Sequence, residues 1–169
     1  MKNGHRICIA AFADLEAITG IYNHAIAAEF ETADTVPFHW KRRKGWFRSH
    51  HPDKHPVYVY KIKDTVAGWL SVSPYRNGRQ ALHLTVEVSY YVHPAYKRQG
   101  IGSSLLNHAI QECMRFQYQH IIAIVLDKNS ASIKLLSKFG FATWGHLPEV
   151  ADFNGKRCGH LYMGICLIK

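Results

Sequence analysis

The stretch from residue 82 to residue 106, LHLTVEVSYYVHPAYKRQGIGSSLL, constrains this chain more than any other. Its first half alternates apolar and polar residues, which is the pattern of a strand with one buried face. Its second half is a basic turn with two glycines that leads into an amphipathic helix. A strand, a glycine turn and a helix N-terminus together form a site suited to a phosphorylated ligand.

The turn itself is residues 97–103, KRQGIGS. Its two glycines let the backbone approach a ligand closely, and the free N–H groups at the start of the helix can bind anionic oxygens. Lys97 and Arg98 add positive charge. A plain strand-to-helix connection with solvated basic residues is the alternative. The turn is neither a Walker A loop, since no Lys-Ser or Lys-Thr follows the glycines, nor a dinucleotide fingerprint, since Leu105 replaces the third glycine.

A carboxylate, Glu87, lies inside the apolar part of the predicted strand. Period two places Thr85, Glu87, Ser89 and Tyr91 on one face and Val86, Val88, Tyr90 and Val92 on the other. A carboxylate between valines is costly to bury unless it is paired or its pKa is raised in a way that suits proton transfer. The alternative is a glutamate that faces solvent from an antiparallel strand.

The sequence Val-Glu-Val-Ser-Tyr-Tyr-Val-His-Pro, followed by the turn at residues 97–102, resembles the central motif of the GNAT acetyltransferase superfamily. More closely, it resembles the phosphinothricin and methionine sulfoximine acetyltransferase branch. Similar segments follow one another in the same order along nearly all 169 residues: Ile21-Tyr22-Asn23-His24-Ala25, His55-Pro56-Val57-Tyr58-Val59, Gly68-Trp69, Ser73-Pro74-Tyr75-Arg76, Asn129-Ser130-Ala131-Ser132-Ile133 and Gly140-Phe141. The resemblance implies an α/β GNAT fold, a mixed and mostly antiparallel sheet flanked by helices, in one domain over residues 1–169.

The resemblance also implies a reaction. The expected activity moves the acetyl group of acetyl-CoA directly to the amine of a small amino-acid-like acceptor, such as phosphinothricin or methionine sulfoximine. Glu87 is the expected general base, acting directly or through a water. The residues expected to bind acetyl-CoA are Tyr90, Tyr91, Val92, Lys97, Arg98, Gln99, Gly100, Ile101, Gly102, Ser103, Asn129 and Lys138. Those expected to bind the acceptor are Phe30, Tyr75, Arg76, Glu87, Val88 and Ser89. A homodimer is implied as well.

Three positions depart from the pattern of the resembled family. Lys97 stands at a motif position that is commonly Arg or Gln. Leu136 stands where many members have a tyrosine as general acid and where this branch often has histidine, which leaves the leaving thiolate without that donor; Tyr162 is a remote substitute. Gly159-His160 replaces an acidic position, so the acceptor is less certain from sequence than acetyl-CoA is.

Composition sets wider limits. A chain of 169 residues fits one domain with a sizeable core, and no run of 18 apolar residues occurs. Because Asp14 and Glu16 interrupt the short apolar run near the N-terminus, we expect a soluble, cytoplasmic protein with no membrane partner. The four cysteines have no paired spacing, which predicts free thiols. The twelve histidines include no HExxH pattern, and we expect no metal.

The net charge of +9 and the pI near 9.5 favour an anionic partner, which could be coenzyme A or a nucleic acid. Because the basic residues are scattered, we expect no nucleic acid, and the Lys41–Lys44 run reads as a solvated helix face. Three alternatives stay open. The chain could acetylate another amine (a polyamine, another amino acid or a protein N-terminus), bind acyl-CoA as a sensor without turnover, or be a basic nucleic-acid-binding module.

The periodicity along the chain predicts an order of elements typical of a mixed α/β sheet. The predicted strands are residues 6–11, 57–62, 66–72, the central strand, 120–126, 145–150 and 158–168. The predicted helices run from an Asp14 N-cap to residue 28, from Pro37 through Phe47, over residues 100–116, and over residues 130–138 behind an Asn129 N-cap.

Overall fold

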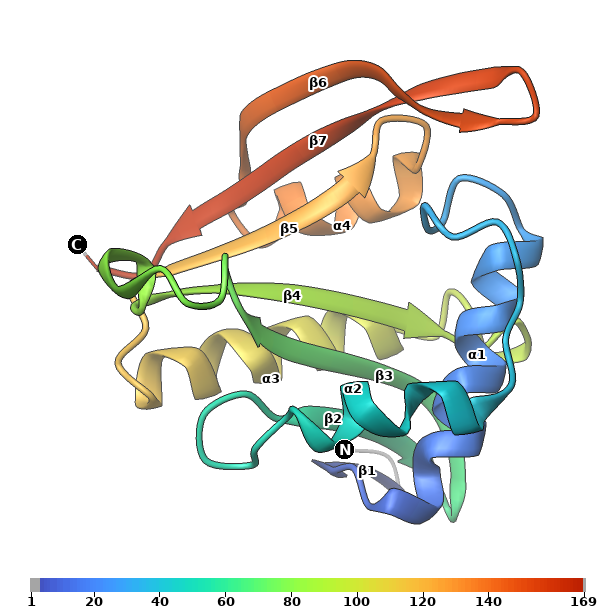
Figure 1. The fold of residues 1–169 in the computed structure, drawn as a ribbon. Helices are drawn as coiled ribbons and strands as arrows, with labels where there is room; N and C mark the ends of the chain where they lie inside the picture. Colours follow the sequence, from blue (N-terminus) through green and yellow to red (C-terminus); the bar gives the residue numbers. More distant parts are fainter. Residues whose placement is uncertain (1–3, 169) are drawn as a thin grey trace.

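The structure, a computed structural model, describes residues 4–168, so the outermost residues of the predicted domain, 1–3 and 169, lie outside the described part. Seven strands form one open sheet in the order β1-β2-β3-β4-β5-β7-β6 (Figure 1). The strands are β1 His5–Ile9, β2 Val57–Ile62, β3 Thr65–Pro74, β4 Thr85–Val92, β5 His120–Leu126, β6 Ala142–Phe153 and β7 Lys156–Cys166. Only β4 and β5 pair in parallel, which confirms the predicted mixed, mostly antiparallel GNAT sheet.

Four α-helices flank the sheet: α1 Leu15–Ala27, α2 Lys44–Arg48, α3 Ile101–Arg115 and α4 Ser130–Lys138. The two faces of β4 separate them as the sequence pattern predicts. Val86 and Val88 are buried in the cluster that contains the apolar side of α3. Tyr91 packs with the other cluster, which α1 and α2 cover. The alternation of β4 therefore divides two hydrophobic layers.

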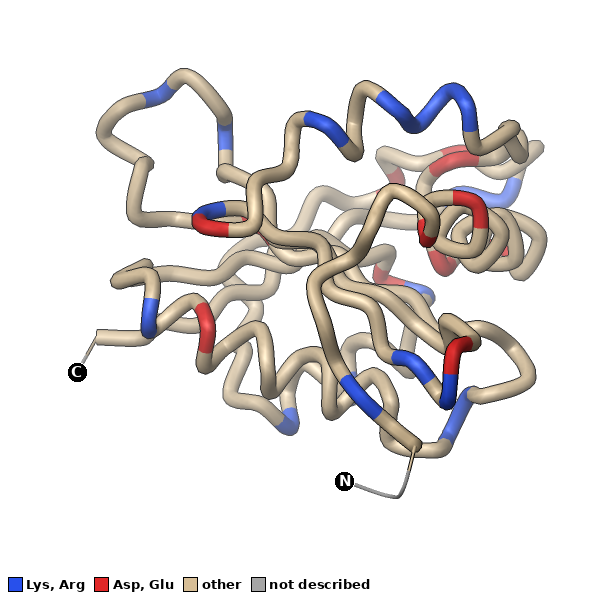
Figure 2. The backbone as a smooth tube through the Cα atoms, turned by 90° about the horizontal axis from the view of Figure 1, so that it is seen from below, with Lys and Arg blue, Asp and Glu red and all other residues tan. Residues whose placement is uncertain are grey.

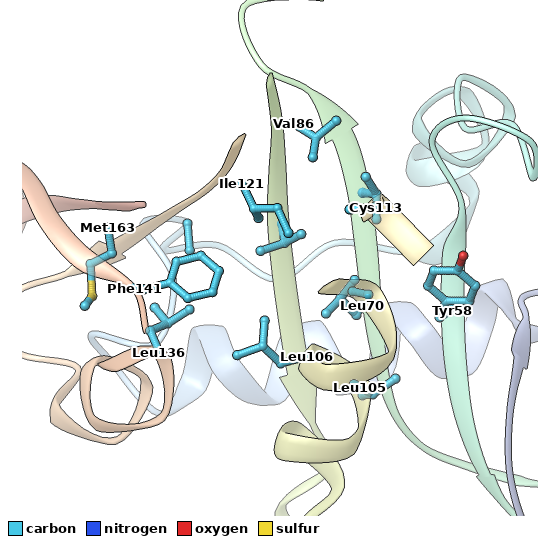
Figure 3. Packing of buried hydrophobic residues seen from close by; sticks show 14 of the residues in the cluster. Tyr58, Leu70, Val86, Leu105, Leu106, Cys113, Ile121, Leu136, Phe141 and Met163 are labelled. Carbon is cyan, nitrogen blue, oxygen red and sulfur yellow. The ribbon is translucent and has the colours of Figure 1, made fainter. Parts of the chain in front are cut away.

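The main core lies between the sheet and α3. Figure 3 shows Leu105 and Leu106 of α3 among Val86 of β4 and Ile121 of β5, and all four side chains are fully buried. The first turn of α3 approaches the sheet closely at Gly68, where an added Cβ would lie 3.0 Å from Ile101 Cγ2. A glycine in β3 therefore lets the N-terminus of α3 sit directly against the carboxyl end of β4.

The first helix begins directly after Asp14 as predicted but lacks the predicted side-chain cap, and the second helix begins later than predicted. Asp14 precedes α1, but its side chain does not cap the helix; it accepts from Ala11 N–H at 2.9 Å and pairs with Lys61 at 2.7 Å. The second helix does not begin at Pro37; the first helical turn begins at Trp40. The amide of Asn23 bonds both the N–H and the C=O of Phe38, which holds the chain after Pro37 extended.

The strand β6 is longer than the predicted residues 145–150, and β7 has the predicted length but begins and ends two residues earlier than residues 158–168. β6 pairs with β7 through register shifts at 143/145 and 147/151, and these irregularities interrupt the alternation on which strand prediction depends. The predicted ranges of β2 and β5 and of α4 agree with the structure. Cys8, Cys113, Cys158 and Cys166 are free thiols, as predicted.

Charge is distributed over the whole fold. Figure 2 shows lysine and arginine positions on several separate loops and helices instead of along one face. Within residues 4–168, no helix is long and apolar enough to cross a membrane.

The packing of α3 gives a first prediction. Leu105→Ala should lower the free energy of unfolding by about 2–5 kcal/mol, because Leu105 is fully buried and its truncation leaves a cavity. Met114→Ala on the same helix is the matched control; its side chain is half exposed, and the change should stay within about 0.5 kcal/mol. Urea unfolding followed by circular dichroism measures both, and equal effects of the two substitutions would contradict the assigned packing.

Candidate active site

The site begins where β4 and β5 separate. The two strands pair only over Thr85–Glu87 and His120–Ile122. Beyond this point β5 continues along β7 to Leu126, while β4 continues along β3 to Val92. Figure 1 shows the two strands diverging toward their carboxyl ends. The β5-facing edge of residues 88–92 therefore has no strand partner in the described chain, and its backbone groups can pair with an extended ligand.

A cavity of about 310 Å³ lies at the open end of this gap. It is bounded by the end of β4, the glycine turn, the first turn of α3 and the N-terminal turns of α4. The lining residues are Glu31, Tyr90, Tyr91, Val92, Tyr96, Lys97, Arg98, Gly100, Ile101, Gly102, Ser103, Asn129, Ala131, Ser132 and Leu135. We call this the cofactor cavity.

The floor of the cofactor cavity suits phosphate groups. Arg98 and Gly100 have positive φ angles of 62° and 81°, and Gly100 caps α3 without a side-chain hydrogen bond. The first N–H groups of this 15-residue helix are thus available to donate hydrogen bonds to a ligand, and they lie at the positive end of the helix dipole. An added Cβ at Gly102 would lie 3.1 Å from Leu135 Cδ2, so glycine is what allows α4 to approach here. The residues present therefore fit the diphosphate of coenzyme A.

A second cavity of about 270 Å³ continues from the first between the separated strands. The two cavities share the residues Glu31, Tyr90, Tyr91, Asn129 and Ser132. The remaining lining residues are Thr32, Ala33, Glu87, Val88, Ser89, Ala123, Ile124, Val125, Leu126 and His160. A ligand that fills the cofactor cavity can therefore extend toward Glu87. We call the second cavity the acceptor cavity.

Glu87 is held in the acceptor cavity without a bonding partner. Its neighbour across the strand pair is Ser73, and no hydrogen bond or ion pair to its carboxylate forms within residues 4–168. Burial raises its pKa above the ordinary value, because the charged form loses solvation. A carboxylate with a raised pKa, open to a cavity and free of partners, can accept a proton.

The structure locates the groups considered as proton donors. Leu136 is fully buried, so the position that differs from the family pattern contributes only to the core. Tyr162 pairs with Ile124 across the β5–β7 ladder and lines neither cavity. Tyr90 lines both, and its hydroxyl donates to the Ser132 carbonyl at 3.4 Å. Burial raises its pKa to about 12, so its phenol is neutral near pH 7 and can donate a hydrogen bond.

Ten of the twelve residues predicted to bind acetyl-CoA line the cofactor cavity. Asn129 does so and also caps α4, accepting from Ser132 N–H at 3.1 Å, so the predicted cap is confirmed and does not remove the residue from the cavity. Gln99 does not line it and bonds back to the Ala95 carbonyl at 3.4 Å. Lys138 does not line the cofactor cavity either, because it lies in the last turn of α4, roughly 13 Å along the helix axis from Asn129.

The predicted acceptor residues divide between two places. Glu87, Val88 and Ser89 line the acceptor cavity together. Tyr75 and Arg76 line a separate cavity of about 470 Å³ instead. The reason is the backbone: Arg76 has a positive φ of 52°, and the loop turns past the amino end of β4, whereas the acceptor cavity opens toward its carboxyl end.

Phe30 is also outside the acceptor cavity. Its ring packs edge-to-face against Phe153 at 5.0 Å, in a cluster with Leu126 and Cys158. Phe30 thus packs in a small hydrophobic cluster and does not line the cavity that contains Glu87. The next residues of the same loop line the cavity in its place: Glu31, Thr32 and Ala33.

Sequence reasoning missed Glu31, Thr32 and His160 as lining residues. The residue predicted from this loop is the aromatic Phe30, whereas the neighbouring polar residues Glu31 and Thr32 line the cavity. His160 stands out in sequence only as a replacement for an acidic residue. It lies opposite Leu126 in the β5–β7 ladder, and that register cannot be read from the chain alone.

Comparisons with known proteins agree with this geometry. The profile of the Acetyltransferase (GNAT) family matches residues 18–141. A Bacillus subtilis (strain 168) protein, provisionally named a phosphinothricin acetyltransferase, is 39% identical over 88% of this chain and 91% of its own. An L-methionine sulfoximine/L-methionine sulfone acetyltransferase of Salmonella typhimurium (strain LT2) is 33% identical over 82% of this chain and 80% of its own.

A solved structure adds a neighbour with a ligand. The GNAT superfamily phosphinothricin acetyltransferase from Sinorhizobium meliloti, in complex with AcCoA, superimposes with a TM-score of 0.89 at 25% identity, covering 96% of this chain and 88% of that one. The chain described here belongs to the GNAT family of acetyltransferases. Within the described residues, no group of three or more His, Cys, Asp or Glu side chains is arranged to hold a metal ion.

The burial of Glu87 gives a second prediction. The folded-state pKa lies above the ordinary 4.5, so below about pH 4.5 the side chain is neutral and carries no penalty. As the pH rises through the raised pKa, the unfolding free energy of the wild type falls, because the half-buried carboxyl group becomes charged. Glu87→Gln has no such charge and does not lose this stability. The unfolding free energy of the variant minus that of the wild type should therefore increase with pH. Urea unfolding at several pH values between about 4 and 8 measures it, and a difference independent of pH would contradict the burial.

Proposed function

We propose that this protein transfers the acetyl group of acetyl-CoA to the α-amine of a small amino acid of the methionine sulfoximine or phosphinothricin type, with Glu87 as general base. One observation carries the proposal: a cavity suited to diphosphate continues into a second cavity that contains a half-buried carboxylate with no partner among the described residues. The family membership and the names of the relatives support the same reaction.

The cofactor cavity binds and orients. We assign the glycine turn and the first turn of α3 to the diphosphate, with Lys97 and Arg98 supplying charge. The unpaired edge of β4 at residues 90–92 holds the extended pantetheine arm through backbone pairing, and a neighbouring N–H polarises the carbonyl under attack. Acetyl-CoA supplies the activated acyl group as a thioester. No cysteine is needed, since transfer is direct.

Glu87 removes the proton that blocks the reaction. An amino acid carries its amine as ammonium near neutral pH, and an ammonium has no lone pair with which to attack. The Glu87 carboxylate takes that proton, directly or through a water, and the neutral amine then attacks. The raised pKa of Glu87 brings its basicity closer to the working pH than that of an exposed glutamate.

The third prediction tests base and acceptor together. Free-thiol release is measured with acetyl-CoA and L-methionine sulfoximine, phosphinothricin and a panel of amino acids and polyamines. Glu87→Gln should lower kcat/KM by about 10²–10⁴-fold. Its affinity for coenzyme A should not change, because Glu87 lines only the acceptor cavity. Glu16→Gln, an exposed glutamate of α1, is the control and should behave as the wild type.

Each outcome of that assay decides something. Turnover on polyamines alone would keep the fold and the cofactor but overturn the acceptor. Binding of acetyl-CoA without turnover of any amine would make the protein an acyl-CoA sensor. Failure to bind acetyl-CoA, with binding to nucleic acid instead, would overturn the proposal as a whole. In the wild type, kcat/KM should fall as the pH drops through the raised pKa of Glu87, because the protonated carboxyl cannot accept a proton.

We also propose a cytoplasmic homodimer. Support comes from β6, an outer strand of the sheet, which exposes the large apolar residues Trp144, Leu147 and Val150. Several large apolar residues exposed on an edge strand are typical of a surface that a partner covers. The free cysteines and the use of acetyl-CoA support the cytoplasm, which fractionation of cells that express the protein would test.

The fourth prediction concerns this dimer. Light scattering coupled to gel filtration should give twice the 19.3 kDa mass of one chain. Leu147→Asp should shift the mass to that of one chain, because a carboxylate at an apolar interface is costly to desolvate. Phe12→Asp, at an exposed aromatic outside β6, is the matched control and should leave the mass unchanged. A wild type with the mass of one chain would overturn the dimer.

A further inference from the structure

Glu31 occupies the junction of the two cavities. It lines both, and it is the one carboxylate among the described residues that line the cofactor cavity. Its Oε1 forms an ion pair with Lys97 Nζ at 2.5 Å, and both side chains are about one-third to two-fifths exposed. The lysine of the proposed diphosphate site is therefore paired with a carboxylate from the loop after α1.

The loop holds Glu31 in this place through contacts on both sides. Glu29 and Phe30, just before it, have φ angles of 49° and 56°. This left-handed backbone conformation is unfavourable for residues other than glycine. Phe30 is fixed against Phe153, and Thr32, just after it, is buried. Because the ends are anchored, a change at Glu31 can occur in its own side chain without moving the loop.

A phosphate ligand and Glu31 compete for the same lysine. An exposed ion pair is weak, worth only a few-fold in an equilibrium constant, because water screens it and two flexible side chains must be ordered. A diphosphate carries more charge and is also held by the first N–H groups of α3. A ligand at the turn therefore draws Lys97 away from Glu31, and the freed carboxylate faces the acceptor cavity.

We infer that Glu31 binds the ammonium group of the acceptor once the diphosphate has taken Lys97. The carboxylates that line the acceptor cavity, among described residues, are Glu31 and Glu87. Glu31 stays charged and holds the amino group by an ion pair. Glu87 takes one proton from the nitrogen, which leaves a neutral amine and a neutral carboxyl group. Acetyl-CoA and the acceptor then bind cooperatively, each tightening the binding of the other. This inference rests on the proposed function of the turn and of Glu87.

The test is the coupling between the two ligands, measured by calorimetry without turnover. The probes are coenzyme A and the amino acid that turns over fastest in the thiol-release assay. In the wild type, saturating coenzyme A should tighten acceptor binding by about two- to fivefold, because the gain is limited to the strength of the Glu31–Lys97 ion pair that the acceptor no longer has to break. In Glu31→Gln the coupling should disappear, acceptor binding should be weak with or without coenzyme A, and coenzyme A itself should bind about two- to fivefold more tightly.

Lys97→Met gives the opposite result for the acceptor and so guards against a simple folding defect. The substitution should weaken the binding of coenzyme A, because a positive charge beside the diphosphate is lost. It should also make acceptor binding to the coenzyme A-free protein as tight as binding to the wild-type complex, because Glu31 is already free. Glu29→Gln is the matched control: it removes the same charge two residues away, where Glu29 pairs with Lys156 on the surface, and it should keep the wild-type coupling.

The outcomes separate the inference from the proposed function. If the coupling survives in Glu31→Gln, the proposed role of Glu31 is overturned. If Lys97→Met still weakens the binding of coenzyme A in that case, the turn remains the proposed diphosphate site. Coenzyme A affinity that is unchanged in Lys97→Met would overturn the assignment of the turn itself. Equal loss of coupling in Glu29→Gln and Glu31→Gln would show a general charge effect of the loop, which also contradicts the inference.

Discussion

The separation of β4 from β5 is the constraint on which the rest of this structure depends. Two parallel strands pair for three residues and then follow different neighbours, β3 on one side and β7 on the other. Backbone groups inside a protein need partners, so an unpaired strand edge between two layers of helices is a site that a ligand must complete. The cofactor cavity, the acceptor cavity and Glu87 all lie along this edge.

Charge is divided along the same gap. At one end, Lys97, Arg98 and the N-terminus of α3 form a positive site, and at the other end Glu87 lies half-buried with no partner among the described residues. Glu31 stands between them and pairs with Lys97. Such an arrangement suits an anionic donor and the ammonium group of an acceptor on opposite sides of the point where they would react, which is what direct transfer between two substrates requires.

Much of the fold follows from local sequence signals, whereas the shape of the site does not. The alternation in β4 and the glycine turn before α3 are patterns of neighbouring residues, and both were predictable. The positions of Arg76, Phe30 and Lys138 depend on how a loop turns or how far a helix extends from its cap. The role of Glu31 as a neighbour of Lys97 depends on a contact between residues 66 positions apart. His160 lines the cavity because of the register of β7, and the irregular pairing of β7 with β6 makes that register hard to predict from the sequence.

Amide hydrogen exchange, with and without acetyl-CoA, tests the central claim most directly. If acetyl-CoA completes the open edge of β4, the amides of residues 90–92 and 100–103 should exchange markedly more slowly when it is bound, while those of the Tyr75–Arg79 loop should not change. Protection of that loop, or unchanged exchange at β4 and the glycine turn under saturating acetyl-CoA, would contradict the account.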